Sequence, residues 1–437
     1  MTECKQISFG FPTCKSRKVL ADFNGGDVTS DGGVLLLRQV DRRLGLTRRL
    51  SGILKDRRRR GSCDHDQLRL LRQRIYALAL GYEDINDHST LRKDVALQTA
   101  VEADEDLAST STLCRWENSA DRETAVRISG LLVEQFISSF KKAPKELILD
   151  FDATDDPVHG KQEGRFFHGY YDHYCFLPLY VFCGEKLLVS YLRPSNIDAA
   201  RHAWAILSLL VKRFRQVWPG VKIIFRGDSG FCRWRMLSWC DNNEVSYITG
   251  VAKNSRLNDK ASALMEKAKS EHEASGEKQR LFSEISYSAY TWDKERRILV
   301  KAEHSDQGSN PRYVVTNLSG DPQKLYDEVY CARGDMENRI KEQQLGLFSD
   351  RTSCTKWWAN QFRVMLSSLA YVLLQTLRSV ALKGTMLAHA QCCTIRVKLM
   401  KIGAVILRNT RRIVFHLSSA CPYQKIFRMA VKRLSTA

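Results

Sequence analysis

Residues 146–154 read ELILDFDAT, an apolar stretch that carries two carboxylates toward its end. Period-two alternation places Asp150 and Asp152 on one face with Ile148, which predicts a β-strand. Carboxylates in an apolar strand are costly unless a cation or a hydrogen-bond donor meets them, so a functional site is one interpretation. A turn at the strand end, formed by Asp152, is the structural alternative.

Strands and helices alternate on the C-terminal side of this stretch. We expect strands at 176–183, 187–192, 221–225 and 245–251, with helices at 197–216 and 233–241. Three more strand-like runs follow at 285–292, 297–302 and 312–318, ahead of helices at 322–344 and 356–377. This order predicts an α/β fold, a mixed sheet flanked by helices, with a β-strand insertion at about 280–320.

The N-terminal part is expected to be helical and basic. A helix that begins near Asp66 has an apolar seam at three-four-three spacing, and arginines precede and flank that seam. The candidates for DNA contact are Arg57, Arg58, Arg59, Arg60, Arg69 and Arg72. A solvated basic surface is an equally good interpretation. A second helix at about 122–140 ends before Pro144, which marks a boundary and gives regions 1–140, 141–380 and 381–437, the last one basic.

The composition of the whole chain favours a polyanionic partner. Among its 437 residues, 68 Lys and Arg against 49 Asp and Glu give a net charge of +19 and a pI of about 9.4. Nucleic acid is the first candidate, because basic side chains that neutralise phosphates release counterions. No membrane partner is expected, since the longest uncharged apolar run, at 364–377, is shorter than a spanning helix. The 13 cysteines form no CxxC pair, so we expect reduced, mostly buried thiols in a cytoplasmic protein.

A second acidic strand end lies at residues 223–231, IIFRGDSGF. Glycines on both sides of Asp228 allow a sharp turn and the close approach of a ligand. A helix N-cap is the alternative role for this aspartate.

The third acidic position lies on the expected helix at 322–344. Tyr330, Arg333, Glu337, Lys341 and Gln344 follow one another at steps of three or four, so they share one face. Pairing within the helix is the structural alternative. Two strand-end aspartates and one glutamate would supply the hard oxygen ligands that Mg²⁺ prefers, and the neighbouring cations could hold DNA phosphates.

In combination these motifs resemble the DDE transposases of bacterial insertion sequences, in the branch described as DDE domain, group 1. Tyr330, Arg333 and Glu337 match the Tyr-x2-Arg-x3-Glu signature of that group, whereas Gln344 stands where its lysine usually lies. The resemblance extends over nearly the whole chain, through the segments TSDGGVLLLRQVDRRLGL, LILDFDATDDPVHGKQEG, FRGDSGF, RYVVTNL, YCARGDMENRIKE and KLMKIGAVILRN.

The resemblance implies a ribonuclease-H-like catalytic core in which Asp152, Asp228 and Glu337 are the catalytic residues and hold two Mg²⁺ ions, with Mn²⁺ able to substitute. Asp150 is the alternative first ligand. It implies Tyr330, Arg333 and Lys341 as DNA contacts. Trp292, in the insertion, is a candidate for stacking on a flipped base, and a core tryptophan is the commoner case.

A family of this kind implies cut-and-paste transposition: binding of terminal inverted repeats and target DNA, strand cleavage and strand transfer by a homodimeric synaptic complex. The expected location is the bacterial cytoplasm, at the nucleoid when the protein is bound to DNA. Two other functions stay open, a metal-dependent nuclease without strand transfer and a catalytically silent DNA-binding protein derived from a transposase. The enzymatic interpretation depends on three distant acidic side chains that approach one another in the fold.

Overall fold

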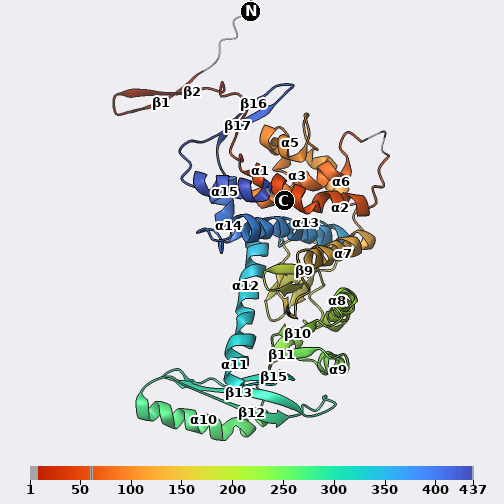
Figure 1. Cartoon of the computed structure of the whole chain (residues 1–437), viewed down its shortest axis with the longest axis vertical. Helices are drawn as coiled ribbons and strands as arrows, with labels where there is room; N and C mark the ends of the chain where they lie inside the picture. The colour runs from red at the N-terminus through yellow and green to blue at the C-terminus, as the bar shows by residue number, and fades with distance from the viewer. Residues whose placement is uncertain (1–7, 60, 62, 436–437) are drawn as a thin grey trace, which may run out of the picture. The chain divides into compact units, whose positions relative to one another are not determined.

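The structure is a computed structural model that describes residues 8–59, 61 and 63–435 (Figure 1). Its contacts divide the chain into two compact units. The central unit is Glu117–Ser368, and the terminal unit combines the segment that ends at Trp116 with the segment that begins at Leu369. These limits differ from the sequence-based boundaries at 140 and 380, because the helix α7 (Arg122–Ser138) packs on the central unit and C-terminal strands pair with an N-terminal one. The three functional regions stay a prediction.

A mixed sheet forms the middle of the central unit, as the sequence predicts. Its strand order is β12-β13-β15-β11-β10-β4-β8-β9, and β14 pairs with β13 beside this path. The five strands that matter most are β4 (Glu146–Ala153), β8 (Leu179–Cys183), β9 (Lys186–Tyr191), β10 (Lys222–Gly227) and β11 (Ser246–Val251). β4, β8 and β9 are antiparallel neighbours, whereas β10 runs parallel to both β4 and β11.

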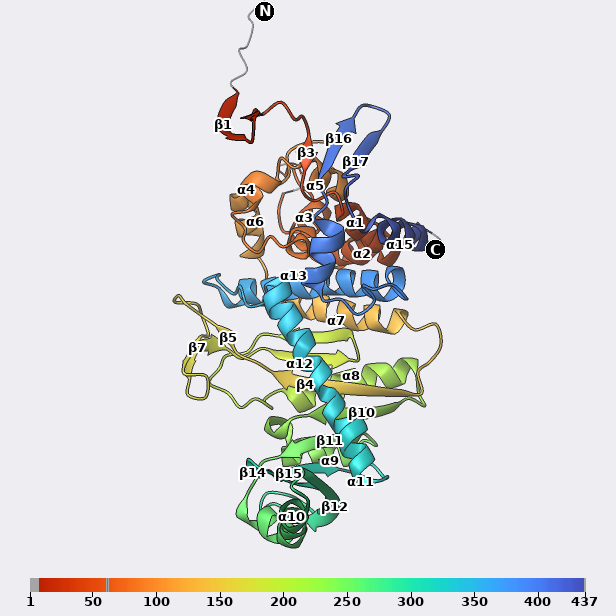
Figure 2. The same ribbon diagram turned by 90° about the vertical axis from the view of Figure 1, so that its left-hand side faces the viewer.

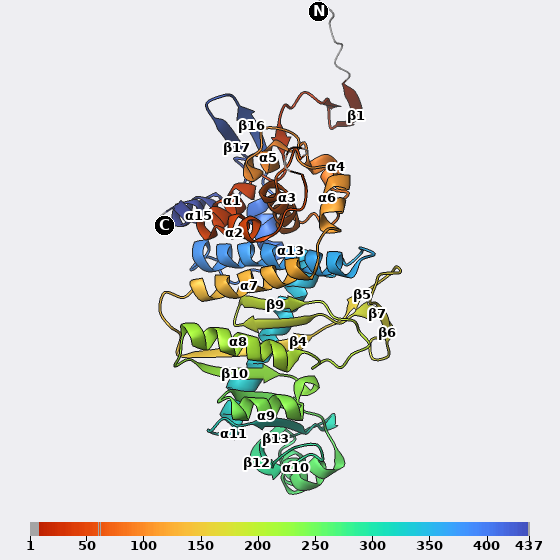
Figure 3. The ribbon, with the colours of Figure 1, turned by 90° about the vertical axis from the view of Figure 1, so that its right-hand side faces the viewer.

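Helices cover the two faces of this sheet, and the alternation in β4 decides which residues meet which helices. Leu147, Leu149 and Phe151 belong to the core formed with α8 (Ala203–Val217) and α9 (Trp234–Asn242), the helices in front of the sheet in Figure 3. Ile148 belongs to the smaller core under Leu325, at the start of the long helical segment that crosses the other face in Figure 2. Since Asp150 and Asp152 alternate in step with Ile148, they lie under that segment.

This helical segment replaces the single helix expected at 322–344, and it is irregular. It consists of α11 (Pro322–Lys324), the π-helix η3 (Leu325–Tyr330), the 3₁₀ turn η4 (Cys331–Arg333), α12 (Gly334–Lys341) and the π-helix η5 (Glu342–Gly346). Each change of winding rotates the side chains that follow it. Such π segments inside helices are frequent at functional sites.

The strands of the insertion that the sequence predicts at about 280–320 extend the main sheet and do not form a sheet of their own. β12 (Gln279–Tyr287), β13 (Arg296–Ser305), β14 (Gly308–Ser309) and β15 (Arg312–Thr316) continue the main sheet, because β15 pairs with β11. A free edge on β11 would leave backbone groups unpaired, and β15 covers that edge. α10 (Ser255–Ser275), which the sequence did not predict, packs on β12 and β13. Few of its residues are buried, mostly small ones, so its periodicity is weak.

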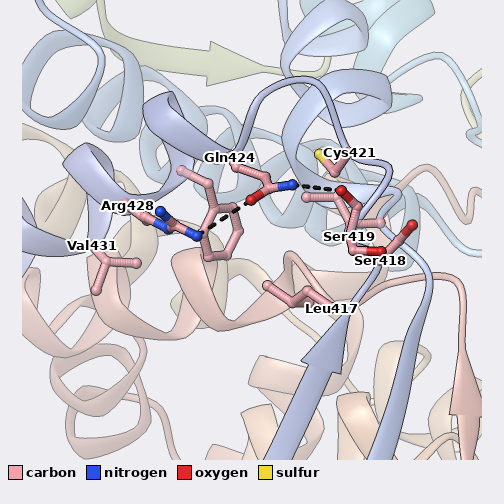
Figure 4. Close-up of a pocket in the computed structure, with 9 residues that line it drawn as sticks. Leu417, Ser418, Ser419, Cys421, Gln424, Arg428 and Val431 are labelled. Carbon is pink, nitrogen blue, oxygen red and sulfur yellow. Dashed lines mark hydrogen bonds between the residues drawn. The ribbon is translucent and has the colours of Figure 1, made fainter.

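The terminal unit is mostly helical in its N-terminal part. α1 (Val34–Leu44), α2 (Leu46–Ile53), α3 (Gln67–Leu80) and α5 (Val95–Val101) pack together, and α3 begins after the N-cap Asp66, as predicted. The C-terminal strands β16 (Ala404–Arg408) and β17 (Ile413–Leu417) pair with each other, and β16 pairs with β3 (Val28–Thr29). A hollow of about 510 Å³ lies beside α15 (Gln424–Ser435), lined by Leu417, Gln424, Arg428 and Val431 among others (Figure 4).

Among the described residues, one helix is long and apolar enough to cross a membrane by length and composition, Trp357–Ala381. Since 78% of its most apolar window is buried inside the protein, it has the character of a core helix and is weak evidence for a membrane span. The twelve described cysteines are all free thiols. Only Cys175, Cys240, Cys354 and Cys392 are buried, so the expectation of mostly buried thiols is wrong.

Candidate active site

Two of the predicted acidic residues lie side by side at one edge of the sheet. Asp152 is near the end of β4, and Asp228 directly follows β10. The two strands are parallel, and Gly227 is in register with Phe151, so the next residue on each strand is an aspartate. Carboxyl ends of neighbouring parallel strands are where open α/β sheets commonly place their sites.

The third acid, Glu337, reaches this edge through Arg333. The Arg333 guanidinium donates from Nη1 to Asp152 Oδ2 at 3.0 Å and from Nη2 to Glu337 Oε1 at 2.9 Å. Asp152 is mostly buried, whereas the side chain of Glu337 is 51% exposed. One arginine on the irregular helical segment thus joins a strand-end carboxylate to a helix carboxylate.

The electrostatics show that the three carboxylates share one environment. Burial, together with the nearby charges of Asp228 and Glu337, raises the pKa of Asp152 to about 6 against the lowering effect of Arg333. Burial by itself would lower the pKa of Arg333, but the surrounding carboxylates hold it above its ordinary value. A buried carboxylate whose pKa is raised by neighbouring like charges is typical of a site that takes a cation.

Asp150 lies on the same face of β4 as Asp152, but its carboxylate pairs with a different arginine. Arg226, its partner in the β4–β10 register, donates to both of its oxygens, from Nε and, at 2.8 Å, from Nη2. Arg226 also donates from Nη1 to the carbonyl oxygen of Val329, the residue before Tyr330. Burial raises the pKa of Asp150, and Arg226 lowers it in part. Asp152 is therefore better placed than Asp150 to be the first metal ligand.

Arg226 is a residue that the sequence analysis missed. It ties β4, β10 and the helical segment together, so it fixes the elements that carry all three acidic side chains. The available signal was a charged residue inside the apolar run IIFRGD, but the partner of that charge became visible only through strand pairing.

The donor set fits Mg²⁺ in its chemistry but is not a ready-made metal site. Within residues 8–59, 61 and 63–435, no group of three His, Cys, Asp or Glu side chains is arranged to hold a metal ion. The three carboxylates nevertheless supply the hard oxygens that Mg²⁺ prefers, and a divalent cation would relieve their mutual repulsion. In this arrangement Arg333 provides the positive charge between Asp152 and Glu337.

The other predicted DNA contacts of this unit differ in their surroundings. Tyr330 is half-buried, with its ring 5.5 Å from that of Tyr326, and Lys341 is exposed. Gln344 donates to the backbone oxygen of Asp155 at 2.8 Å.

Trp292 packs edge-on against Tyr287 with ring centroids 5.7 Å apart, and Arg296 lies over its ring. Trp292 thus packs against the core, as in the alternative interpretation of a core tryptophan.

Arg72 corrects the expectation of a surface cation. It is buried, and its guanidinium donates to Glu102 at 2.7 Å and to the Thr47 hydroxyl at 3.2 Å. The cause is that α3 is buried on nearly all sides, so residues that flank its apolar seam are inside the unit as well.

The remaining predicted arginines of the terminal unit are nearer the surface. Arg69 forms an ion pair with Glu105 at 2.8 Å, and Arg58 forms one with Asp56 at 2.7 Å. The others are Arg57 and Arg59, which are exposed, and Arg60, which lies outside the described residues. Exposed arginines in this segment keep their predicted role as candidate DNA contacts.

Comparisons with known proteins bear on the same chain. The solved structure titled "Cryo-EM structure of piggyBac transposase synaptic complex with hairpin DNA" is similar with a TM-score of 0.43 and 9% sequence identity, over 93% of this chain and 82% of that one. No curated protein matches the sequence. A protein-family model described as "Transposase DDE domain group 1" matches residues 11–437. Because that match spans nearly the whole sequence, the chain belongs to the transposase DDE domain group 1 family.

Proposed function

We propose that the protein is the transposase of an insertion sequence, which binds the terminal inverted repeats of its element and carries out Mg²⁺-dependent strand cleavage and strand transfer. The observation that carries the proposal is the joint electrostatic environment of Asp152, Asp228 and Glu337 around Arg333. These acidic residues come from two strands and a helix and lie 76 and 109 positions apart in sequence. Bringing like charges together does not stabilise a fold by itself, so their proximity favours a functional role.

The sheet supports a ribonuclease-H-like core. Three antiparallel strands, β9, β8 and β4, are followed across the sheet by β10 and β11, which run parallel to β4. Asp152 and Asp228 stand on the two central strands of this arrangement, and the helical segment brings Glu337 over them.

The chemistry follows from the residues at the sheet edge. Asp152, Asp228 and Glu337 would hold the divalent ions, which when bound activate the attacking oxygen and stabilise the leaving one. Arg333 would turn its two donors to a phosphate of the DNA strand, because phosphate and carboxylate oxygens suit the same guanidinium fork. Tyr330 and Lys341 lie on the same segment and would flank that phosphate.

DNA is the proposed partner, in keeping with the net charge of +19. The inverted repeats, the target DNA and a homodimer in the synaptic complex are part of the proposal, as is a bacterial cytoplasmic location. The terminal unit supplies exposed arginines such as Arg57 and Arg59 that would contact the DNA backbone.

The test is the Asp228→Asn variant of the full chain, assayed on labelled DNA that carries the ends of the element. We expect cleavage to fall below detection while binding of the end DNA stays at the wild-type affinity. Asp259→Asn, which removes the same charge from the exposed surface of α10, is the matched control and should cleave normally. Cleavage by Asp228→Asn at the wild-type rate would remove this residue from the site.

A second readout separates transposition from simple hydrolysis. Wild-type protein should join the 3′-hydroxyl ends that it produces to a target plasmid, which gel analysis detects as products larger than the substrate. Cleavage without joined products would instead indicate a nuclease, and end binding without cleavage would indicate a silent DNA-binding protein.

A further inference from the structure

A small hollow lies next to Asp228, on the side away from β4. It has a volume of about 260 Å³ and is bounded by the turn after β10, the end of β11, the start of β15 and the π-helix η3. β10, β11 and β15 are neighbours in the sheet, and the helical segment that contains η3 crosses the face of these strands (Figures 1 and 2). Its polar lining consists mainly of Ser229, Lys253, Arg312 and Tyr330.

The hollow is rich in positive charge. Lys253 and Arg312 are both exposed, and Lys253 donates to the side-chain oxygen of Asn310 at 3.3 Å. Neither cation forms an ion pair with a carboxylate in the part of the chain that the structure describes. They differ in this from Arg333, whose charge is shared between two carboxylates. Two cations without acidic partners are available to an anionic ligand.

Gly250 lies in the hollow where two other groups of its lining come close to the backbone. A Cβ atom on this residue would lie 2.7 Å from the Tyr330 hydroxyl, so that the tyrosine would have to shift, and 3.0 Å from the backbone nitrogen of Ser229, which is tighter than most real contacts. Gly250 does not have a positive φ, so its backbone conformation is open to other residues. The glycine therefore gives room to the Tyr330 hydroxyl and to the turn after β10, as expected where another part of the chain approaches closely.

We propose that this hollow binds a backbone phosphate of the DNA strand that enters the active site, an inference that rests on the proposed function. Lys253 and Arg312 supply the charge, and the hydroxyls of Ser229 and Tyr330 supply further donors. Lysine and arginine side chains have no acceptor atoms, so the lining selects an anion over a cation. The volume is below the range typical of drug-sized ligands, which suits a single phosphate and its sugar.

The position of the hollow gives it a role in the reaction. Asp228 repels any phosphate that comes near it, and the proposed Mg²⁺ ligands add further negative charge. Cations on the far side of Asp228 would hold the strand in place against that repulsion and set which phosphodiester bond faces the carboxylates. Arg333 and this hollow would then grip the strand on two sides of the acidic residues.

The first test measures how the affinity for a fluorescein-labelled single-stranded oligothymidylate depends on salt. The double variant Lys253→Gln/Arg312→Gln should reduce the slope of log K against log salt by about 0.7, since the hollow holds one phosphate and each phosphate contact on a single strand contributes about 0.7. The control Lys260→Gln/Lys324→Gln removes the same charge from exposed positions outside the hollow and should leave the slope unchanged. An equal fall in both double variants, or in neither, would overturn the inference.

The second test uses the wild-type chain and so does not depend on how a variant folds. Lysine acetylation followed by mass spectrometry should show Lys253 protected by the oligothymidylate and Lys260 unprotected. Inorganic phosphate at the same phosphate concentration should give little protection. If DNA leaves Lys253 as reactive as Lys260, or if inorganic phosphate protects it equally, the hollow is not a DNA-strand site.

The failure of this inference can be told apart from the failure of the proposed function. If Asp228→Asn abolishes cleavage but the double variant keeps the wild-type salt slope, the transposase proposal stands and the hollow has another role. If the double variant shows a smaller salt slope and DNA protects Lys253 from acetylation, but Asp228→Asn still cleaves DNA, the strand site stands and the catalytic assignment fails.

Discussion

Breaking the buried pair between Asp150 and Arg226 should destabilise the central unit strongly. The two residues are 3% and 6% exposed, so solvent screens their charges little. Asp150→Asn removes the negative charge and leaves the guanidinium buried, which typically costs 3–5 kcal/mol. Asparagine can still accept one hydrogen bond, and Arg226 keeps its bond to the carbonyl of Val329. We therefore expect the lower end of that range, about 3 kcal/mol.

Thermal and urea unfolding of the full chain would measure this loss. For a unit of this size each kcal/mol shifts Tm by about 2–4 °C, so the transition of the central unit should fall by about 6–12 °C. Glu134→Gln is the control, because it breaks an exposed pair with Arg213 (2.6 Å) and should cost less than about 1 kcal/mol. The double variant Asp150→Asn/Arg226→Leu, which removes the buried charge as well, should recover much of the loss.

A loss of unfolding free energy in Asp150→Asn no larger than that in Glu134→Gln would contradict a stabilising role for this pair. If the double variant is less stable than Asp150→Asn by itself, the cost does not come from an unpaired buried charge. Because Arg226 also holds the backbone at Val329, a confirmed loss should be accompanied by faster hydrogen exchange in the segment 325–333.

Two further predictions concern the acidic residues. The pKa of Asp152 in the folded chain is about 6, above its ordinary value of 3.8, so protonation of Asp152 favours the folded state. This stabilisation amounts to about 3 kcal/mol. It is complete below pH 4 and is lost as the pH rises through 6. Unfolding measured without divalent metal across this range should show the fall in wild type and a flatter profile in Asp152→Asn; parallel profiles would contradict the assignment. Arg333→Ala removes the cation between Asp152 and Glu337, so Mn²⁺ binding by calorimetry should tighten about tenfold, or 1.4 kcal/mol. Unchanged or weaker binding would show that the guanidinium does not compete with the metal.

The sequence was most informative where a pattern depends on near neighbours. Alternation in residues 146–154 predicted both the strand and the face that its two aspartates share, and the structure has them on the face under the helical segment. The signature around Glu337 led to the family, which the family match confirmed. The catalytic roles of these residues stay a prediction.

Pairing between distant segments was beyond the reach of those patterns. The sequence did not indicate that β15 would continue the sheet from β11, because a strand pattern carries no information about its partner. The sequence also predicted that Arg72 is exposed, which was wrong. An arginine beside an apolar seam is exposed only if the rest of its helix faces solvent, and α3 is buried on nearly all sides. The π segments of 325–346 were hidden as well, because winding responds to packing and hydrogen bonding across the sheet.

By itself, the sequence determined which side chains carry acidic and basic chemistry and which local elements present them, because both follow from residue type and short-range periodicity. Tertiary structure alone decided that Asp150 is neutralised by Arg226, whereas Asp152, two residues farther along the same strand, forms its ion pair with Arg333. The physical reason is that the energy of a buried charge depends on which partner the fold brings within a few ångströms, and that distance is set by strand register and helix position.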